Sequence, residues 1–214
     1  MTLTFYMDNP VDRIRGISAA ATAVTRGDLV VLPTDTVYGI GCDAFSPKAV
    51  TELLAAKGRG RDMPVPVLVG NPNVVDGLAY DLTQTARDLI EGFWPGALTV
   101  VVKAQHSLAW DLGDVDGTVA IRMPLHPVAI ELLRSTGPMA VSSANRSGSA
   151  PATTAEEALE QLGESVSIYL EAGTCGEPVP STIVDVTGAV PRVVRLGAID
   201  LETLRTVCPD ILSD

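Results

Sequence analysis

Capped helices alternate with short apolar runs along this chain, and this alternation limits the possible folds more than any other feature of the sequence. Asn9 and Pro10 are typical of a helix start, because asparagine caps free N–H groups and proline fits the first helical position. The amphipathic stretch that follows ends at Gly27, and residues 29–32 then predict a buried strand. The order of elements is therefore that of an α/β protein.

The same signals recur to the end of the chain. Helices are predicted at residues 46–58, 83–92 and 126–135, and another follows the capping box of Thr154 and Glu157. Strands are predicted at residues 97–103, 118–123, 138–143, 165–171, 181–186 and 192–196. The last two are joined too briefly for a helical crossover, which indicates a mixed parallel and antiparallel sheet flanked by helices. We expect one domain over residues 1–214, with its core at about 10–200.

The apolar run at residues 65–69 is a special case. Pro64 and Pro66 cannot donate to a strand ladder, so the run is expected near a sheet edge or at the start of a strand.

Charge and cysteine content narrow the function. A formal net charge of −11 repels polyanions, which disfavours non-specific binding of nucleic acid and means that any anion site must be local. Three well-separated cysteines support neither a disulfide framework nor a zinc site. No leader or membrane span is visible, so a cytoplasmic protein is expected.

Cations nevertheless gather at a few places. Lys57, Arg59 and Arg61 lie within five positions just after a predicted helix, where a lysine alone would suffice to complement the helix dipole. Arg122 and Arg195 lie in or at the end of apolar strands, where each guanidinium needs an anionic or polar partner. A buried salt bridge would satisfy that need, but the set as a whole favours a cleft for a phosphorylated or carboxylated ligand.

Two polar segments, residues 33–41 and 142–148, follow predicted strands, where α/β proteins often bind ligands. Each could also be a simple turn or cap. The chain lacks the glycine-rich phosphate loops of common nucleotide folds, and neither His106 nor His126 accompanies a recognisable nucleophile. No metal-ligand spacing is present, so Mg²⁺ would arrive with the phosphates of a nucleotide.

A family resemblance rests on six segments in series: "PTDTVYGIG", "KGR", "TVAIRMP", "SSANRSG", "PSTIVD" and "VVRLG". In this order and at similar spacing they resemble the YrdC-like threonylcarbamoyl-adenylate synthases, over nearly the whole chain and in the short, single-domain form. The resemblance implies a twisted mixed sheet with a basic concave face.

It also implies an activity: L-threonine, bicarbonate or CO₂ and ATP are joined into threonylcarbamoyl-AMP and pyrophosphate, the donor for threonylcarbamoyladenosine in tRNA. ATP is then a substrate, Mg²⁺ accompanies its phosphates, and no prosthetic group is expected. Downstream threonylcarbamoyl-transferase proteins would receive the product. Contact with tRNA would be weak or indirect, and no membrane partner is implied.

Site residues follow from the matched positions. The resemblance assigns L-threonine to Thr36, Arg122, Ser143 and Ser181, and ATP to Arg59, Thr118, Asn145, Thr153 and Arg195. Lys57 and Arg59 are the expected catalytic residues, screening repulsion between the anionic carbamate and the phosphates. No protein metal site is implied.

This sequence departs from the family at two positions, because Met63 and Leu68 replace an asparagine and a histidine that relatives often carry. Contacts from these side chains are therefore in question. Two alternatives stay open: a non-enzymatic RNA-binding module, disfavoured by the acidic charge and 4% aromatic content, and a domain that handles carbamoyl-adenylate, disfavoured by the absence of fused segments.

Overall fold

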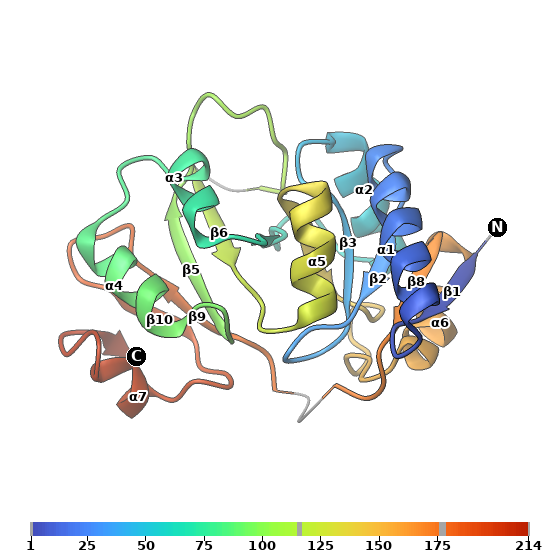
Figure 1. Ribbon diagram of the computed structural model, residues 1–214. Coiled ribbons are helices and arrows are strands. Elements are labelled where there is room, and N and C mark those ends of the chain that lie inside the picture. Colours follow the sequence, from blue (N-terminus) through green and yellow to red (C-terminus); the bar gives the residue numbers. More distant parts are fainter. Residues whose placement is uncertain (1, 115–116, 176–178, 214) are drawn as a thin grey trace.

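One mixed sheet runs through the whole protein (Figure 1). A computed structural model describes residues 2–114, 117–175 and 179–213, and these contain an 11-stranded sheet. Its strands are β1 (Leu3–Tyr6), β2 (Val30–Leu32), β3 (Gly39–Asp43), β4 (Val67–Leu68), β5 (Leu98–Lys103), β6 (Thr118–Arg122), β7 (Met139–Ser143), β8 (Ile168–Glu171), β9 (Thr182–Asp185), β10 (Arg192–Arg195) and β11 (Leu212–Ser213).

The strand order is β1-β8-β2-β3-β7-β4-β6-β5-β9-β10-β11. Parallel pairs such as β5 with β9 stand beside antiparallel pairs such as β3 with β7. The closely spaced β9 and β10 pair antiparallel, as their short connection predicts. The expected mixed sheet is thus confirmed.

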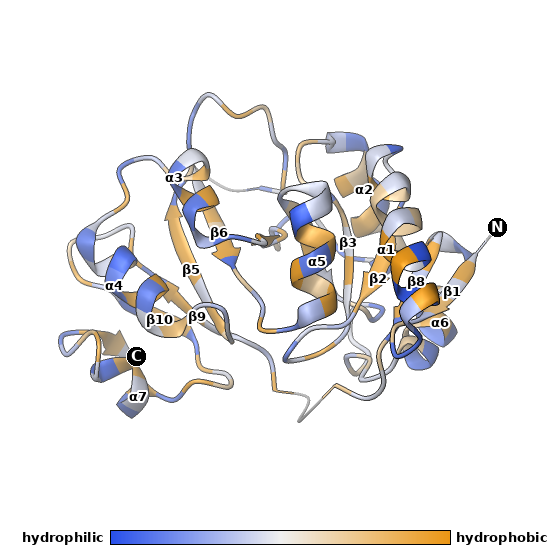
Figure 2. Cartoon of the chain, viewed as in Figure 1, coloured by the Kyte–Doolittle hydropathy of each residue, from blue (hydrophilic) through white to orange (hydrophobic). Residues whose placement is uncertain are grey.

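Helices lie against both faces of this sheet. They are α1 (Pro10–Thr25), α2 (Pro47–Lys57), α3 (Val75–Leu78), α4 (Gln84–Phe93), α5 (Pro127–Thr136), α6 (Ala155–Leu162) and α7 (Leu201–Arg205). α4 and α5 carry hydrophobic and hydrophilic bands, as helices with one buried side do (Figure 2).

Two hydrophobic clusters fill the space between helices and sheet. The smaller one joins α1 and α5 to one face, through residues such as Ile17 and Leu132. The larger one joins α2, α4 and α6 to the other face, through residues such as Leu53 and Leu89. Because neighbouring strand residues point to opposite faces, Val30 belongs to the smaller cluster and Val31 to the larger.

Local capping explains why the helices begin where the sequence predicts. The Asn9 side chain accepts hydrogen bonds from the backbone of Val11 and Asp12, and Ser46 does the same for Ala49. Gly58 ends α2 with a φ of 62°, in the left-handed region that glycine adopts at little cost. The helices predicted from these signals are confirmed.

The sheet differs from expectation at four strands, of which β1 and β11, at the two ends of the strand order, were not predicted from the sequence. β4 lies between β7 and β6, so the proposed sheet-edge position is wrong, and the alternative of a strand start directly after Pro66 is right. β3 occupies residues that the sequence suggested as a polar loop. Its Gly39 and Gly41 lack side chains because a Cβ there would lie 2.6 Å and 2.9 Å from Val141.

No helix among the described residues has the length and apolar character needed to cross a membrane.

A close approach at Gly197 yields a test of the fold. A Cβ at this position would lie 2.1 Å from the Pro180 carbonyl oxygen, so the segment after β10 would have to move away from Ser181. Gly197→Ala should lower the free energy of unfolding by about 1–3 kcal/mol, measured by urea denaturation. Gly77→Ala is the control, because a Cβ there meets nothing within 4 Å; since Gly77 lies in α3, alanine should raise the free energy of unfolding by up to about 1 kcal/mol rather than lower it. Equal stability of the two variants would contradict this packing.

Candidate active site

A cavity of about 460 Å³ opens on the sheet face that carries α1 and α5. Strand alternation defines its floor: Val100 and Ile121 belong to the larger core, whereas Val101, Ala120 and Arg122 line the cavity. The remaining wall comes from the loop after β2, the segment after α2, the end of β7 and the segment around β9 and β10. Segments far apart in sequence therefore meet at one place.

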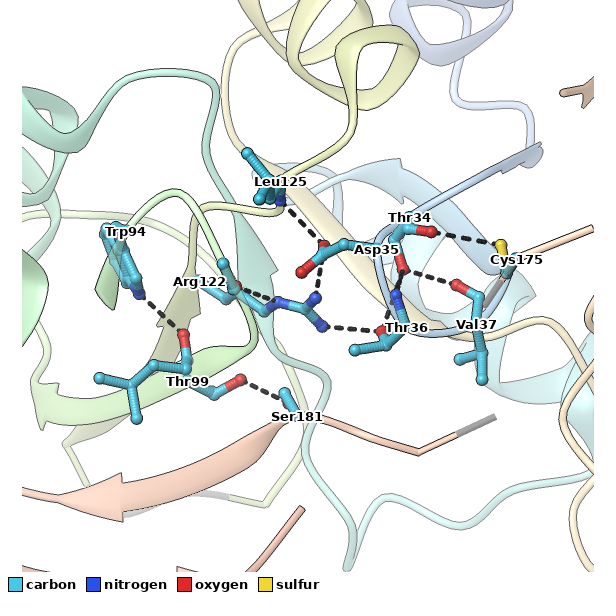
Figure 3. A network of polar contacts seen from close by, with 12 residues as sticks. Thr34, Asp35, Thr36, Val37, Trp94, Thr99, Arg122, Leu125, Cys175 and Ser181 are labelled. Atoms are coloured by element: carbon cyan, nitrogen blue, oxygen red, sulfur yellow. Dashed lines mark hydrogen bonds and ion pairs between the residues drawn. The ribbon is translucent and has the colours of Figure 1, made fainter. Parts of the chain in front are cut away.

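Arg122, at the end of β6, lines this cavity and is hydrogen-bonded through all three of its guanidinium nitrogens (Figure 3). Its Nε donates to the Gly96 carbonyl at 2.9 Å, one terminal nitrogen donates to Thr36 Oγ1 at 3.1 Å, and the other lies 2.6 Å from Asp35 Oδ1. Burial lowers the pKa of Arg122, and the Asp35 carboxylate opposes that change. The guanidinium is thus fixed in orientation while one edge remains in the cavity wall.

The loop after β2 presents threonine hydroxyls to the cavity. Thr34 Oγ1 donates to the Val37 carbonyl at 2.6 Å and lies 3.0 Å from Thr36 Oγ1. The hydroxyl of Thr34 has a single proton, which it donates to Val37. The hydroxyl of Thr36 therefore donates to Thr34 Oγ1 and accepts from Arg122. The thiol of Cys175 donates to the Thr34 carbonyl and so extends this network by one more side chain (Figure 3).

Ser181 joins the opposite side of the cavity to β5 and β10. Its hydroxyl lies 2.8 Å from Thr99 Oγ1, and Arg195 donates to its carbonyl at 2.7 Å. Burial lowers the pKa of Arg195, and the positive charge of Arg59 lowers it further. Two guanidinium groups therefore face the same region.

Arg59 follows the left-handed turn at Gly58 and reaches into the cavity. Its terminal nitrogens donate to Ser142 Oγ at 3.0 Å and to the Pro64 carbonyl at 3.4 Å. Its Nε is buried and has no hydrogen-bond partner among the described residues. Burial lowers its pKa, which the carboxylate of Asp62 partly offsets. A buried donor without a partner is suited to an anionic ligand.

Lys57 lies behind the wall rather than in it. It is 3% exposed, and its Nζ donates to the carbonyls of Ser143 and Asn145 and to Asn145 Oδ1. Burial, followed by the charge of Arg59, lowers the pKa of Lys57 to about 8. The ammonium therefore holds the loop after β7 in place.

The structure brings six of the sequence-predicted residues to the cavity wall: Thr36, Arg59, Arg122, Ser143, Ser181 and Arg195. Four others lie outside that wall: Lys57, Thr118, Asn145 and Thr153. The expectation that Lys57 faces the reacting anions disagrees with its geometry, because its ammonium points at backbone carbonyls.

The other three have definite surroundings. Asn145 is buried, and its amide donates to the carbonyls of Arg146 and Ser149. Thr153 donates its hydroxyl to Glu157 at the start of α6. Thr118 lines a separate cavity of about 300 Å³ beneath the connection from β5 to β6.

Three wall residues in the polar networks were absent from the sequence prediction, namely Thr34, Thr99 and Ser142, and so was Asp35, the acid that pairs with Arg122. A usable signal existed for Asp35: an arginine in an apolar strand requires an acid, and Asp35 adjoins the predicted Thr36. Of the two departures from the family pattern, Leu68 lines the cavity and Met63 is 50% exposed.

A metal centre built by the protein needs several His, Cys, Asp or Glu side chains close together. No group of three or more His, Cys, Asp or Glu side chains among these residues could hold a metal ion.

Comparisons with known proteins agree on a family. The sequence model of the Sua5/YciO/YrdC family, described as "Telomere recombination", matches residues 22–197. A Mycobacterium tuberculosis protein, provisionally named a threonylcarbamoyl-AMP synthase, is 58% identical over 207 residues, covering 97% of this chain and 95% of that protein. The threonylcarbamoyl-AMP synthase of Bacillus subtilis is 34% identical over 200 residues, covering 92% of this chain and 58% of that protein.

Solved structures agree with the sequence comparisons. P. abyssi Sua5, crystallised with L-threonine, superposes with a TM-score of 0.93 at 30% identity. The match covers 100% of this chain and 62% of the Sua5 chain, so this chain spans less than two thirds of that protein. From the family match and from 58% identity along almost its whole length, this chain belongs to the Sua5/YciO/YrdC family.

Proposed function

We propose that this chain is a threonylcarbamoyl-AMP synthase, which forms threonylcarbamoyl-AMP and pyrophosphate from L-threonine, bicarbonate or CO₂ and ATP. One observation carries the proposal: in a protein of net charge −11, Arg59, Arg122 and Arg195 converge on one cavity, beside hydroxyl groups from separate loops. Relatives named for this activity support it.

The end of the cavity at Arg122 is proposed to bind L-threonine. Of five guanidinium N–H groups, three meet Gly96, Thr36 and Asp35, which leaves two for the substrate carboxylate. Thr36, Ser143 and Ser181 supply hydroxyl and backbone groups for the amine and hydroxyl of threonine. The L-threonine complex of P. abyssi Sua5 supports this assignment.

The end at Arg59 and Arg195 is proposed to bind the phosphates of ATP. Among the described residues both guanidiniums donate to neutral oxygens only, and the Arg59 Nε, which has no partner there, offers one more donor. Thr118 lies on the same strand face as Ala120 and Arg122, so a nucleotide extending along β6 reaches it. Asn145 and Thr153 are proposed to act indirectly, by fixing the loop between β7 and α6. Mg²⁺ is proposed to enter with the phosphates, whose oxygens are its preferred ligands.

The reaction then needs positioning rather than a protein nucleophile. The threonine amine bonds to the carbon of CO₂ and loses a proton, forming a carbamate. A carbamate oxygen next bonds to the α-phosphorus, while the bond from that phosphorus to the bridging oxygen breaks and pyrophosphate leaves. Arg59 and Arg195 stabilise the charge on the phosphoryl oxygens, and Lys57 is a positioning residue that holds the Ser143 loop.

The product is proposed to serve tRNA modification in the cytoplasm, through transferase proteins that accept the threonylcarbamoyl group. Labelled bicarbonate, ATP and each amino acid in turn test the activity, with pyrophosphate and a mixed adenylate as products. An RNA-binding module would release no pyrophosphate, and a carbamoyl-adenylate domain would not require threonine.

The proposed threonine site should discriminate between amino acids. Valine lacks the hydroxyl of threonine and would leave buried polar groups unpaired, so its rate of pyrophosphate release should be lower by about 100-fold or more. Serine loses only a methyl contact worth about 1 kcal/mol and should be intermediate. A valine rate equal to that of threonine would refute the proposed roles of Thr36, Ser143 and Ser181.

Substitution of Arg59 tests the phosphate end. Arg59→Ala should slow pyrophosphate release at saturating substrates by about 100- to 1,000-fold, because one preorganised cationic partner is lost. Arg87→Ala is the control, since Arg87 forms an exposed ion pair with Asp76 outside the cavity. Arg61 is unsuitable, because its ion pairs with Asp111 and Asp114 fix the segment that carries Arg59. Full activity of a folded Arg59→Ala variant would remove the mechanism.

We expect Lys57 to contribute to the stability of the folded protein. Lys57→Met leaves buried carbonyl acceptors unpaired and should lower the free energy of unfolding by about 1–3 kcal/mol. Lys48→Met, at an exposed position of the same helix, should change it by about 0.5 kcal/mol or less. The pKa of Lys57 in the folded protein is about 8, below the ordinary 10.5. As the pH rises, the folded state therefore releases the Lys57 proton before the unfolded state does. The stability gap between wild type and Lys57→Met should therefore widen as pH rises from 8 to 10.5. A gap that narrows would contradict the lowered pKa.

A further inference from the structure

The three arginines of the cavity differ in their partners. Arg122 has a carboxylate, Asp35, at 2.6 Å, with side-chain exposures of 7% and 15%. Arg59 donates to Ser142 and Pro64, and Arg195 donates to Ser181. Within the part of the chain that the structure describes, neither of these two guanidiniums forms an ion pair. Among the described residues, a direct ion pair therefore exists at the Arg122 end, whereas the Asp62 carboxylate attracts Arg59 only from beyond ion-pair distance.

Asp35 is fixed in place from two sides. Its Oδ1 accepts from the terminal nitrogen of Arg122 and, at 2.9 Å, from the backbone N–H of Leu125 (Figure 3). These bonds join the loop after β2 to the end of β6, so the acid cannot turn away without breaking both. The negative charge is thus a permanent part of the Arg122 end.

A guanidinium that forms an ion pair with a carboxylate and one that forms no ion pair favour different ligands. Beside Asp35, a single carboxylate can use the two remaining N–H groups of Arg122, and the ammonium or amine of an amino acid is not repelled. A phosphate group carries more negative charge than one carboxylate and, unlike an amino acid, has no covalently attached ammonium, so it is repelled by Asp35 at short range. At Arg59 and Arg195 the repulsion is weaker, because no described carboxylate lies within ion-pair distance of either guanidinium and Asp62 acts on Arg59 only from farther away.

We infer that Asp35 is a specificity-determining residue, which reserves the Arg122 end for an amino acid by excluding phosphate groups from it. The inference rests on the proposed function and adds to it a reason why the carboxylate of threonine and the phosphates of ATP do not exchange places in one cationic cavity. Specificity of this kind arises from a repulsive element against the wrong ligand as well as contacts to the right one.

A purely structural role of Asp35 makes a different prediction. If Asp35 only held Arg122 in position, its removal would weaken threonine binding and lower stability, but phosphate would gain nothing. The distinguishing quantity is therefore the competition between phosphate and threonine rather than the affinity for threonine alone.

The test measures binding of L-threonine by calorimetry, with and without inorganic phosphate. In the wild type, phosphate should change the dissociation constant of threonine by less than about twofold, whereas it should compete with AMP. In Asp35→Asn, phosphate should weaken threonine binding by about tenfold. Direct calorimetric titration with phosphate should show an additional site in Asp35→Asn that is lost when Arg122→Gln is added. Asp28→Asn, which removes an acid paired with Arg26 outside the cavity, should behave as wild type.

The outcomes separate the two claims. A folded Asp35→Asn variant that gains no phosphate competition overturns the specificity role but leaves the proposed function intact. If Asp35→Asn does not fold, the wild-type measurement decides, because competition of phosphate with threonine there overturns the inference. Absence of threonine binding in the wild type overturns the proposed function, and the inference with it.

Discussion

The buried guanidinium of Arg122 is the constraint on which the site depends. A charge at the end of an apolar strand costs several kcal/mol unless it is paired and fully bonded, and here the loop after β2 supplies both the acid and a hydroxyl acceptor. Satisfying Arg122 therefore fixes the position of Thr36. Gly96, which follows α4, accepts from the same guanidinium, so three segments far apart in the sequence are joined at this one bonded group.

Local and overall charge oppose each other in this protein. The net charge of −11 repels anionic ligands at long range, yet the cavity presents three guanidiniums at short range. Because salt screens exposed charges within about 10 Å at 0.1 M ionic strength, the repulsion is weakened in solution while the contacts inside the cavity persist. Anion binding is thereby confined to ligands small enough to enter.

The predictability of the fold followed the strength of local signals. Asn9 and Ser46 act as caps whatever lies around them, so the starts of α1 and α2 could be read directly. β3 could not, because its glycines are required by the approach of Val141, a neighbour about a hundred positions away. β4 has two residues and lies inside the sheet only because β6 and β7 flank it. Sequence likewise located the site segments, but the direction of Lys57 and the pairing of Asp35 depend on tertiary contacts.

The shape of each cation, and not only its charge, determines which basic residue can occupy a position in this site. At Lys57 a compact ammonium directs its N–H groups to three oxygens of the loop after β7, and a planar guanidinium would need more room than this buried position provides. At Arg122 the reverse holds, because a flat fork reaches Gly96, Thr36 and Asp35 at once, which a single nitrogen cannot do. Exchanging lysine and arginine would keep the net charge of the protein and disable both positions.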